Sequence, residues 1–166
     1  MPPSDLTHLD KNDRPQMVDV SAKAVTTRTA TATCLVDLGP ELMRDFQQGD
    51  LITKKGSVLQ TATIAGIMGA KRTPDLIPMC HPIGLEKVNI DITPHDTTCL
   101  LVSCTCKITS KTGVEMEALT GASTAALTIY DMCKSKNPSI VISQLQLAEK
   151  RGGKSDFTRP ATSTES

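Results

Sequence analysis

The stretch Gly113–Lys134, GVEMEALTGASTAALTIYDMCK, predicts one long helix around which the rest of the fold is built. Its roughly 21 residues extend about 30 Å, at about 1.5 Å per residue. Thr112 followed by Glu115 fits a capping box, in which Thr112 caps the helix and Glu115 reaches back. The middle, 118–128, contains only Ala, Leu, Thr, Gly and Ser, and a helix without a clear polar face is usually buried. We therefore expect it to pack between a sheet and another element.

Carboxylates stand at both ends of this helix. Asp131 lies in the last turn, where the helix dipole disfavours an anion, and Lys134 follows at a spacing that allows an ion pair. Glu117, near the start, returns to within roughly 40° of the face of Asp131. The two are separated by about 21 Å along the axis, so one small substrate cannot contact both within one chain. Either one of them is structural, or an oligomer brings the ends of neighbouring helices together.

The other predicted elements complete an α+β fold. Residues 24–38 alternate between apolar and threonine positions, which indicates a long strand. A second helix is expected from a capping box at Ser57, and its small residues allow a close approach to another helix. The order of strand, helices, two strands, helix and strand predicts a ferredoxin-like (split βαβ) sandwich, an antiparallel sheet with helices packed on one face. The elements after 24–38 are expected at about 57–72, 86–92, 100–108, 113–134 and 140–148, the last with an irregularity near Ser143.

Length and composition limit the classes of function. The 166 residues predict an N-terminal arm over 1–16, a single domain over 17–154 and a flexible tail over 155–166. Lys+Arg and Asp+Glu both total 18, so no overall field attracts nucleic acid or a membrane, and aromatic side chains for stacking on bases are few. The six cysteines lack a Cys-x-x-Cys pair, which favours reduced thiols over disulfides or a metal site. With no signal segment evident, we expect a cytoplasmic protein.

Basic clusters suggest an anionic ligand. Lys55 precedes a helix start, where a phosphate binds readily, although a solvated turn explains it too. Lys150, Arg151 and Lys154 bracket two glycines in a loop that can close over a phosphate. His81 lies in a proline-rich loop and is either an acid, base or donor, or a structural histidine bonded to backbone. These residues favour acid–base chemistry on a phosphorylated small molecule, with an anion-binding regulatory domain as an equal alternative.

Long motifs carry a resemblance to a known family. MVDVSAK at 17–23, KRTPDLIPMCHP at 71–82, TGVEMEALT at 112–120 and AALTIYDMCK at 125–134 resemble the molybdenum cofactor biosynthesis protein C family, the cyclic pyranopterin monophosphate synthases. The match covers roughly residues 6–157.

The resemblance implies a lyase that acts early in molybdenum cofactor synthesis and needs no metal or other cofactor. Its substrate would be 3′,8-cyclo-7,8-dihydroguanosine 5′-triphosphate, its products cyclic pyranopterin monophosphate and pyrophosphate. It further implies a homohexamer, a trimer of dimers, with active sites between subunits and 17–154 as the catalytic domain.

The resemblance also assigns residues. Asp131, Lys134 and Lys55 match the family's catalytic residues. Arg151 departs from the family, which has a small hydroxyl residue after the lysine of its Gly-Gly loop. Lys23 and Arg28 fit the pattern as second-rank candidates. The residues that match substrate-contacting segments are Met79, Cys80, His81, Glu115, Met116, Glu117 and Lys150.

The hypothesis is that lysines neutralise the triphosphate while Asp131 and Lys134 transfer protons as the guanine ring opens and the pterin forms. Two rival hypotheses remain. One is a non-catalytic nucleotide-sensing module of the same fold, and the other is a metal-dependent cyclohydrolase, for which a spaced Cys/His ligand set is not apparent.

Overall fold

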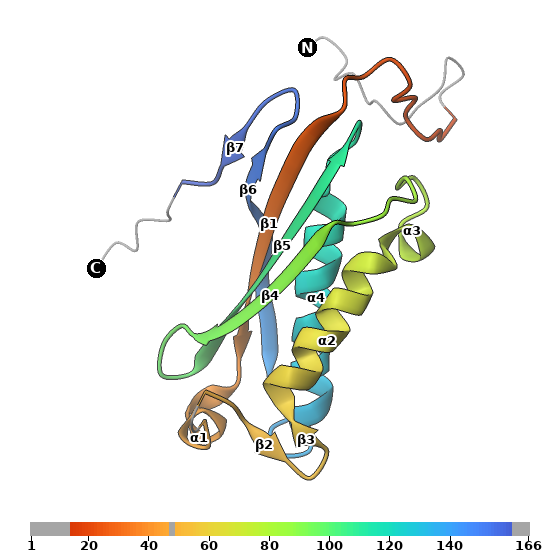
Figure 1. Ribbon diagram of the computed structural model, residues 1–166. Helices are drawn as coiled ribbons and strands as arrows, with labels where there is room; N and C mark the ends of the chain where they lie inside the picture. The colour runs from red at the N-terminus through yellow and green to blue at the C-terminus, as the bar shows by residue number, and fades with distance from the viewer. Residues whose placement is uncertain (1–13, 47–48, 161–166) are drawn as a thin grey trace.

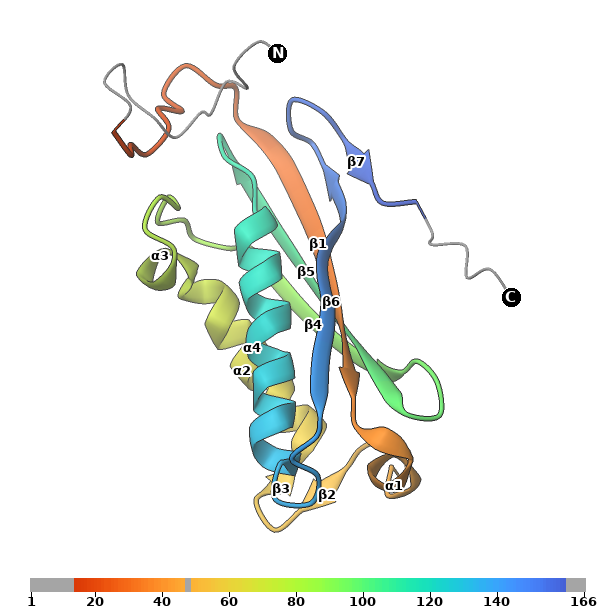
Figure 2. The ribbon, with the colours of Figure 1, turned by 180° about the vertical axis from the view of Figure 1, so that it is seen from behind.

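The computed structural model describes residues 14–46 and 49–160. Two long helices, α2 (Val58–Lys71) and α4 (Glu115–Cys133), pack on one face of a sheet (Figures 1 and 2). The remaining elements are β1 (Thr26–Asp37), α1 (Gly39–Arg44), β2 (Ile52–Thr53), β3 (Gly56–Ser57), α3 (Thr73–Leu76), β4 (Lys87–Pro94), β5 (Cys99–Ser110), β6 (Val141–Arg151) and β7 (Phe157–Thr158).

The main sheet has the strand order β4-β5-β1-β6-β7, and all its pairs are antiparallel. The central strand β1 therefore lies between β5 and β6, the arrangement of a split βαβ unit, and the predicted ferredoxin-like α+β fold is confirmed. The expected irregularity in β6 is present, because the pairing with β1 shifts around Gln144, whose φ is +52°. Strands β2 and β3 form a separate two-stranded ribbon.

Alternation along β1 builds the core as predicted. Ala30, Ala32, Cys34 and Val36 all face the helices and are at most 1% exposed. Since successive side chains on a strand point to opposite faces, the threonines between them lie on the face turned away from α2 and α4.

Small residues let α2 and α4 approach closely. A Cβ added to Gly69 of α2 would lie 2.3 Å from Thr124 Oγ1 of α4. A Cβ added to Gly121 of α4 would lie 2.5 Å from Cys104 Sγ in β5 and 3.3 Å from Ala70 Cβ. The glycines are therefore places where one backbone touches its neighbour, and this close packing occurs within one chain.

The two predicted helix starts have different outcomes. Ser57 caps α2, and its Oγ accepts a hydrogen bond from Gln60 N at 3.1 Å. The capping box at Thr112 is wrong, because α4 begins at Glu115 after Val114, which makes no side-chain cap. The Glu115 carboxylate instead pairs with Lys150 Nζ at 3.3 Å, a partner across the fold.

The C-terminal segment is more ordered than expected. The predicted flexible tail from Ser155 does not hold for Phe157 and Thr158, which form β7 and pair with Lys150 and Glu149 of β6. The predicted arm over 1–16 and the end of the tail lie largely outside the described residues, since 1–13 and 161–166 are not part of them. In the part of the chain that is described, no helix combines the length and hydropathy needed to span a membrane.

Candidate functional site

The predicted site residues form two clusters at opposite ends of α4. One lies beside its first turn, next to the loop that follows α3, and the other beside its last turn, next to β2 and β3 (Figures 1 and 2). The helix separates Glu117 from Asp131 by about 21 Å. One chain therefore does not bring the two sets together.

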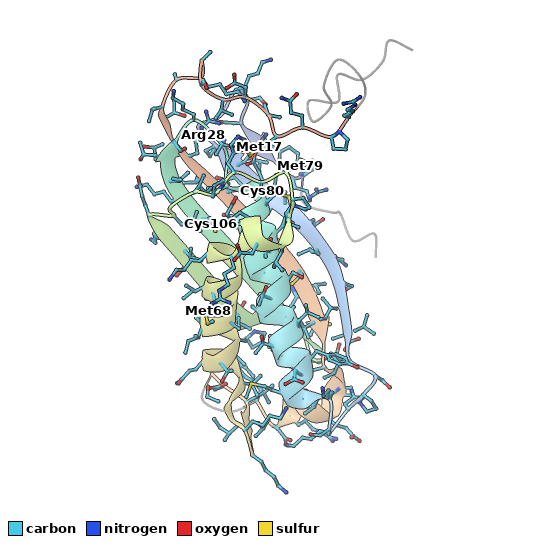
Figure 3. All side chains as sticks on the ribbon, turned by 90° about the vertical axis from the view of Figure 1, so that its right-hand side faces the viewer. Met17, Arg28, Met68, Met79, Cys80 and Cys106 are labelled. Carbon is cyan, nitrogen blue, oxygen red and sulfur yellow. The ribbon has the colours of Figure 1, made fainter. Side chains whose placement is uncertain are left out.

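The first cluster is a pocket of about 480 Å³, a size common among small-molecule sites. Figure 3 shows Arg28, Met79 and Cys80 near this end of the molecule, while Met68 lies further along α2. All predicted substrate-contacting residues line the pocket. Its lining comprises Val18, Val20, Lys23, Arg28, Met79, Cys80, His81, Ile83, Thr112, Gly113, Glu115, Met116, Glu117, Lys150, Gly153 and Lys154.

The back of the pocket holds a buried acid. Glu117 is only 3% exposed, and burial, followed by the charge of Glu115, raises its pKa. Burial and the nearby Glu117 likewise raise the pKa of the Cys80 thiol. Burial disfavours the charged form of an acid, so Glu117 keeps its proton more readily than a free glutamate and can donate a hydrogen bond or a proton.

The rim of the pocket is basic. Arg28 Nε donates to Thr26 Oγ1 at 3.1 Å and to Ser110 O at 3.2 Å, which fixes the direction of its guanidinium group. Lys150 is held by its ion pair with Glu115. Lys23 and Lys154 complete the rim. Together these four cations outnumber the two carboxylates, so the pocket suits an anionic ligand such as a phosphate ester.

His81 anchors the segment that closes the pocket on one side. Its Nε2 lies 2.8 Å from Val18 O, and since a carbonyl only accepts, the ring nitrogen donates. Lys111 Nζ makes a second anchor by donating to Ser21 O at 2.7 Å. His81 therefore makes the backbone hydrogen bond expected of a structural histidine, and it also lines the pocket. Sequence reasoning did not name Val18 and Val20 as site residues, although both lie in the motif at 17–23 that carries the resemblance.

The second cluster joins Asp131 and Lys134, which lie three residues apart in the last turn of α4, with Lys55, which is distant in sequence. Asp131 Oδ1 lies 2.7 Å from Lys134 Nζ, and Asp131 Oδ2 lies 3.1 Å from Lys55 Nζ. Lys55 also donates to the Asp131 carbonyl at 3.2 Å. Hydrogen bonds from Lys134 and then Lys55 lower the pKa of Asp131, and Asp131 in turn raises the pKa of Lys134. The side chains are about half exposed, so a ligand can reach them.

The cysteines give no sign of a metal centre. All six are free thiols, and Cys34, Cys104, Cys106 and Cys133 are buried. Within residues 14–46 and 49–160, no group of three or more His, Cys, Asp or Glu side chains is arranged to hold a metal ion.

Comparison with known proteins identifies the family of the chain. The sequence model of the MoaC family matches residues 17–153. The chain is 51% identical over 153 residues to "Cyclic pyranopterin monophosphate synthase" of Desulfitobacterium hafniense (strain DSM 10664 / DCB-2), with 91% of each chain covered. It is 49% identical over 158 residues to "Cyclic pyranopterin monophosphate synthase 1" of Mycobacterium bovis (strain ATCC BAA-935 / AF2122/97), covering 95% of this chain and 92% of that one. The chain therefore belongs to the MoaC family.

Proposed function

We propose that the protein is a cyclic pyranopterin monophosphate synthase, a lyase of molybdenum cofactor biosynthesis. It converts 3′,8-cyclo-7,8-dihydroguanosine 5′-triphosphate to cyclic pyranopterin monophosphate and releases pyrophosphate. The observation that carries the proposal is the division of the predicted site residues into two compact clusters, in a chain about half identical to proteins named as synthases. The names of these relatives, all those of enzymes, do not favour the alternative of a non-catalytic nucleotide sensor.

The pocket is proposed to bind the substrate. Its basic rim neutralises the triphosphate, with Arg28 and Lys150 already held in place by neighbouring groups. Such fixed cations stabilise charge that develops on the departing pyrophosphate without having to reorganise. Glu117, buried behind the rim, contacts the polar edge of the base.

Asp131, Lys134 and Lys55 are proposed as the catalytic residues. With its lowered pKa, Asp131 stays ionised and accepts protons, while the two ammonium groups donate hydrogen bonds or protons. The guanine ring opens and the pterin forms while protons pass through this cluster.

Both clusters must reach one substrate, which requires two subunits. We propose a homohexamer, a trimer of dimers, in which the Asp131 end of one α4 completes the pocket of a neighbour. Exposed apolar side chains on the outer faces of α2 and α4 support an assembly, because Ile64, Met68 and Leu127 are each about half or more exposed. A cytoplasmic location fits the six free thiols.

The test is incubation of the purified protein with the cyclised nucleotide, following pyrophosphate and the fluorescent pterin derivative. Asp131→Asn keeps the shape and removes the carboxylate, so kcat is expected to fall about a hundredfold or more. Asp45→Asn is the matched control, since Asp45 forms an equally exposed pair with Lys136 at 3.0 Å and belongs to neither cluster. Substrate binding without pyrophosphate release by the wild-type protein would contradict the proposal, and metal analysis of the active protein tests the cyclohydrolase alternative.

A further inference from the structure

We infer that Arg151 is a positioning residue that holds the Gly-Gly turn, and that Lys154 is the residue this turn presents to the phosphates of the substrate. The inference rests on the proposed function and adds to it two residues, each with its own role. Where the resemblance implies a small hydroxyl residue, this chain has Arg151.

Arg151 points away from the pocket although its neighbours line it. Lys150, Gly153 and Lys154 are part of the lining and Arg151 is not. Arg151 is the last residue of β6, and successive residues of a strand point to opposite faces. Lys150 therefore reaches Glu115 at the pocket, whereas Arg151 reaches the opposite side.

On that side the guanidinium group of Arg151 joins β6 to β7. Its Nε lies 3.0 Å from Glu149 Oε1, its Nη2 donates to Thr158 Oγ1 at 3.1 Å, and its Nη1 lies 3.6 Å from Asp156 Oδ2. A small hydroxyl cannot make these contacts together, because only the planar fork of arginine carries several donors in fixed directions. We call this set of contacts the Arg151 brace; it closes the turn formed by residues 152–156, between the two strands seen in Figure 1.

The turn is also tied to the pocket. Asp156 Oδ1 accepts a hydrogen bond from Gly152 N at 3.0 Å, so one carboxylate serves both the brace and the turn. Gly152 has φ of +80°, and a Cβ added there would lie 2.0 Å from Thr27 O, so only glycine fits. Its carbonyl accepts from Thr26 Oγ1 at 2.7 Å, and the same hydroxyl accepts from Arg28 Nε. A continuous chain of hydrogen bonds thus links Asp156 to the pocket arginine.

The brace matters because two glycines are costly to order. Glycine loses more conformational freedom on ordering than any other residue, and a loop that is ordered only on binding weakens the binding. Lys154 follows the two glycines and lines the pocket, and within the described residues no carboxylate pairs with it. Its ammonium group is therefore available to an anion, and the brace supplies the order that its position needs.

The experiment compares Arg151→Ala, Arg151→Lys, Lys154→Ala and the double variant Arg151→Ala/Lys154→Ala. Arg44→Ala is the control, since Arg44 is an exposed arginine paired with Glu41 and belongs to neither cluster. Amide exchange of residues 152–154 is measured without substrate, and kcat and KM with the cyclised nucleotide. Binding of inorganic triphosphate to the free protein gives a readout that is independent of turnover.

In Arg151→Ala we expect faster exchange in the turn, a KM raised about three- to tenfold and a kcat within about twofold of wild type. Lys154→Ala should raise KM and weaken triphosphate binding without changing the exchange. Arg151→Lys should resemble Arg151→Ala, because lysine keeps the charge and loses the fork. The double variant should have a KM close to that of Lys154→Ala alone, since both changes remove the same contact.

Unchanged exchange in Arg151→Ala, or a KM fully restored by Arg151→Lys, overturns the inference, because Arg151 would then act through its charge alone. Fully multiplicative effects in the double variant overturn it as well. A wild-type protein that releases no pyrophosphate refutes the proposed function instead, while the exchange and triphosphate measurements still test the brace.

Discussion

The contact around Gly121 offers a sharp test of how the two helices and the sheet fit together. In Gly121→Ala the new methyl group meets Cys104 Sγ at 2.5 Å, Gly66 O at 3.2 Å and Ala70 Cβ at 3.3 Å. It is therefore confined on three sides, by β5 and by the backbone and a side chain of α2. Of the three atoms, Cys104 Sγ lies closest to the new methyl group, so the strain is expected to fall mainly on Cys104.

The free energy of unfolding follows from opposing effects. Overpacking of a filled core costs about 1–3 kcal/mol, while alanine gains about 1 kcal/mol over glycine within a helix. We expect Gly121→Ala to destabilise by about 1 kcal/mol. Cys104→Ala alone should cost about 1 kcal/mol through the buried volume it removes. In the double variant the new methyl group occupies the space of the lost sulfur. The double variant should therefore be more stable than the sum of the two single effects predicts, by about 1 kcal/mol or more.

Urea unfolding of the four proteins, followed by circular dichroism at one protein concentration, measures this coupling. Gly84→Ala combined with Cys104→Ala is the control, because a Cβ at Gly84 meets nothing within 4 Å. That pair should be additive. If the Gly121 pair were also additive, within about 0.4 kcal/mol, the close contact between Gly121 and Cys104 would be refuted.

Three further outcomes follow from other contacts. Ser57→Ala should lower the free energy of unfolding by about 1 kcal/mol in urea melts, whereas Thr112→Ala should leave it nearly unchanged because Thr112 does not cap α4. Glu117 has a pKa raised above its free value of 4.5, so the folded state binds the proton of this carboxyl more tightly than the unfolded state does. The folded state therefore loses stability as the pH rises from about 4.5 through the raised pKa. Urea melts between pH 4 and pH 8 should show Glu117→Gln losing this decline, and a slope like that of the wild type would contradict it. Lys134→Ala should raise the pKa of Asp131 towards 3.8, measured by carboxyl carbon NMR titration, because the Lys134 hydrogen bond is the main cause of its lowering.

Local sequence patterns predicted the main strands and helices, because the alternation and the size of the side chains along a segment determine how that segment folds and packs. The alternation in 24–38 produced β1, and the small residues of α2 and α4 produced their close packing. The failures involve partners that are distant in the chain. Thr112 and Glu115 have the spacing of a capping box, yet Glu115 pairs with Lys150, which only the fold brings near.

The candidate site shows the same limit. Spacing along α4 indicated that Glu117 and Asp131 lie far apart, which the helix bears out. The brace of Arg151 was beyond prediction, since it depends on β7, a two-residue strand whose partner lies across a turn. The wall formed by Val18 and Val20 is held by hydrogen bonds from His81 and Lys111, both of which are distant in sequence.

The separation of two clusters by one rigid helix has a consequence for mixed populations of subunits. A substitution at Asp131 leaves the pocket end of its own chain intact, and Glu117→Gln leaves the Asp131 end intact. On the proposed assembly, two proteins that are each inactive would restore activity when unfolded together and refolded as a mixture. Some interfaces would then combine the intact pocket of one variant with the intact Asp131 cluster of the other. Two genes that each encode an inactive variant would therefore complement one another in the same cell.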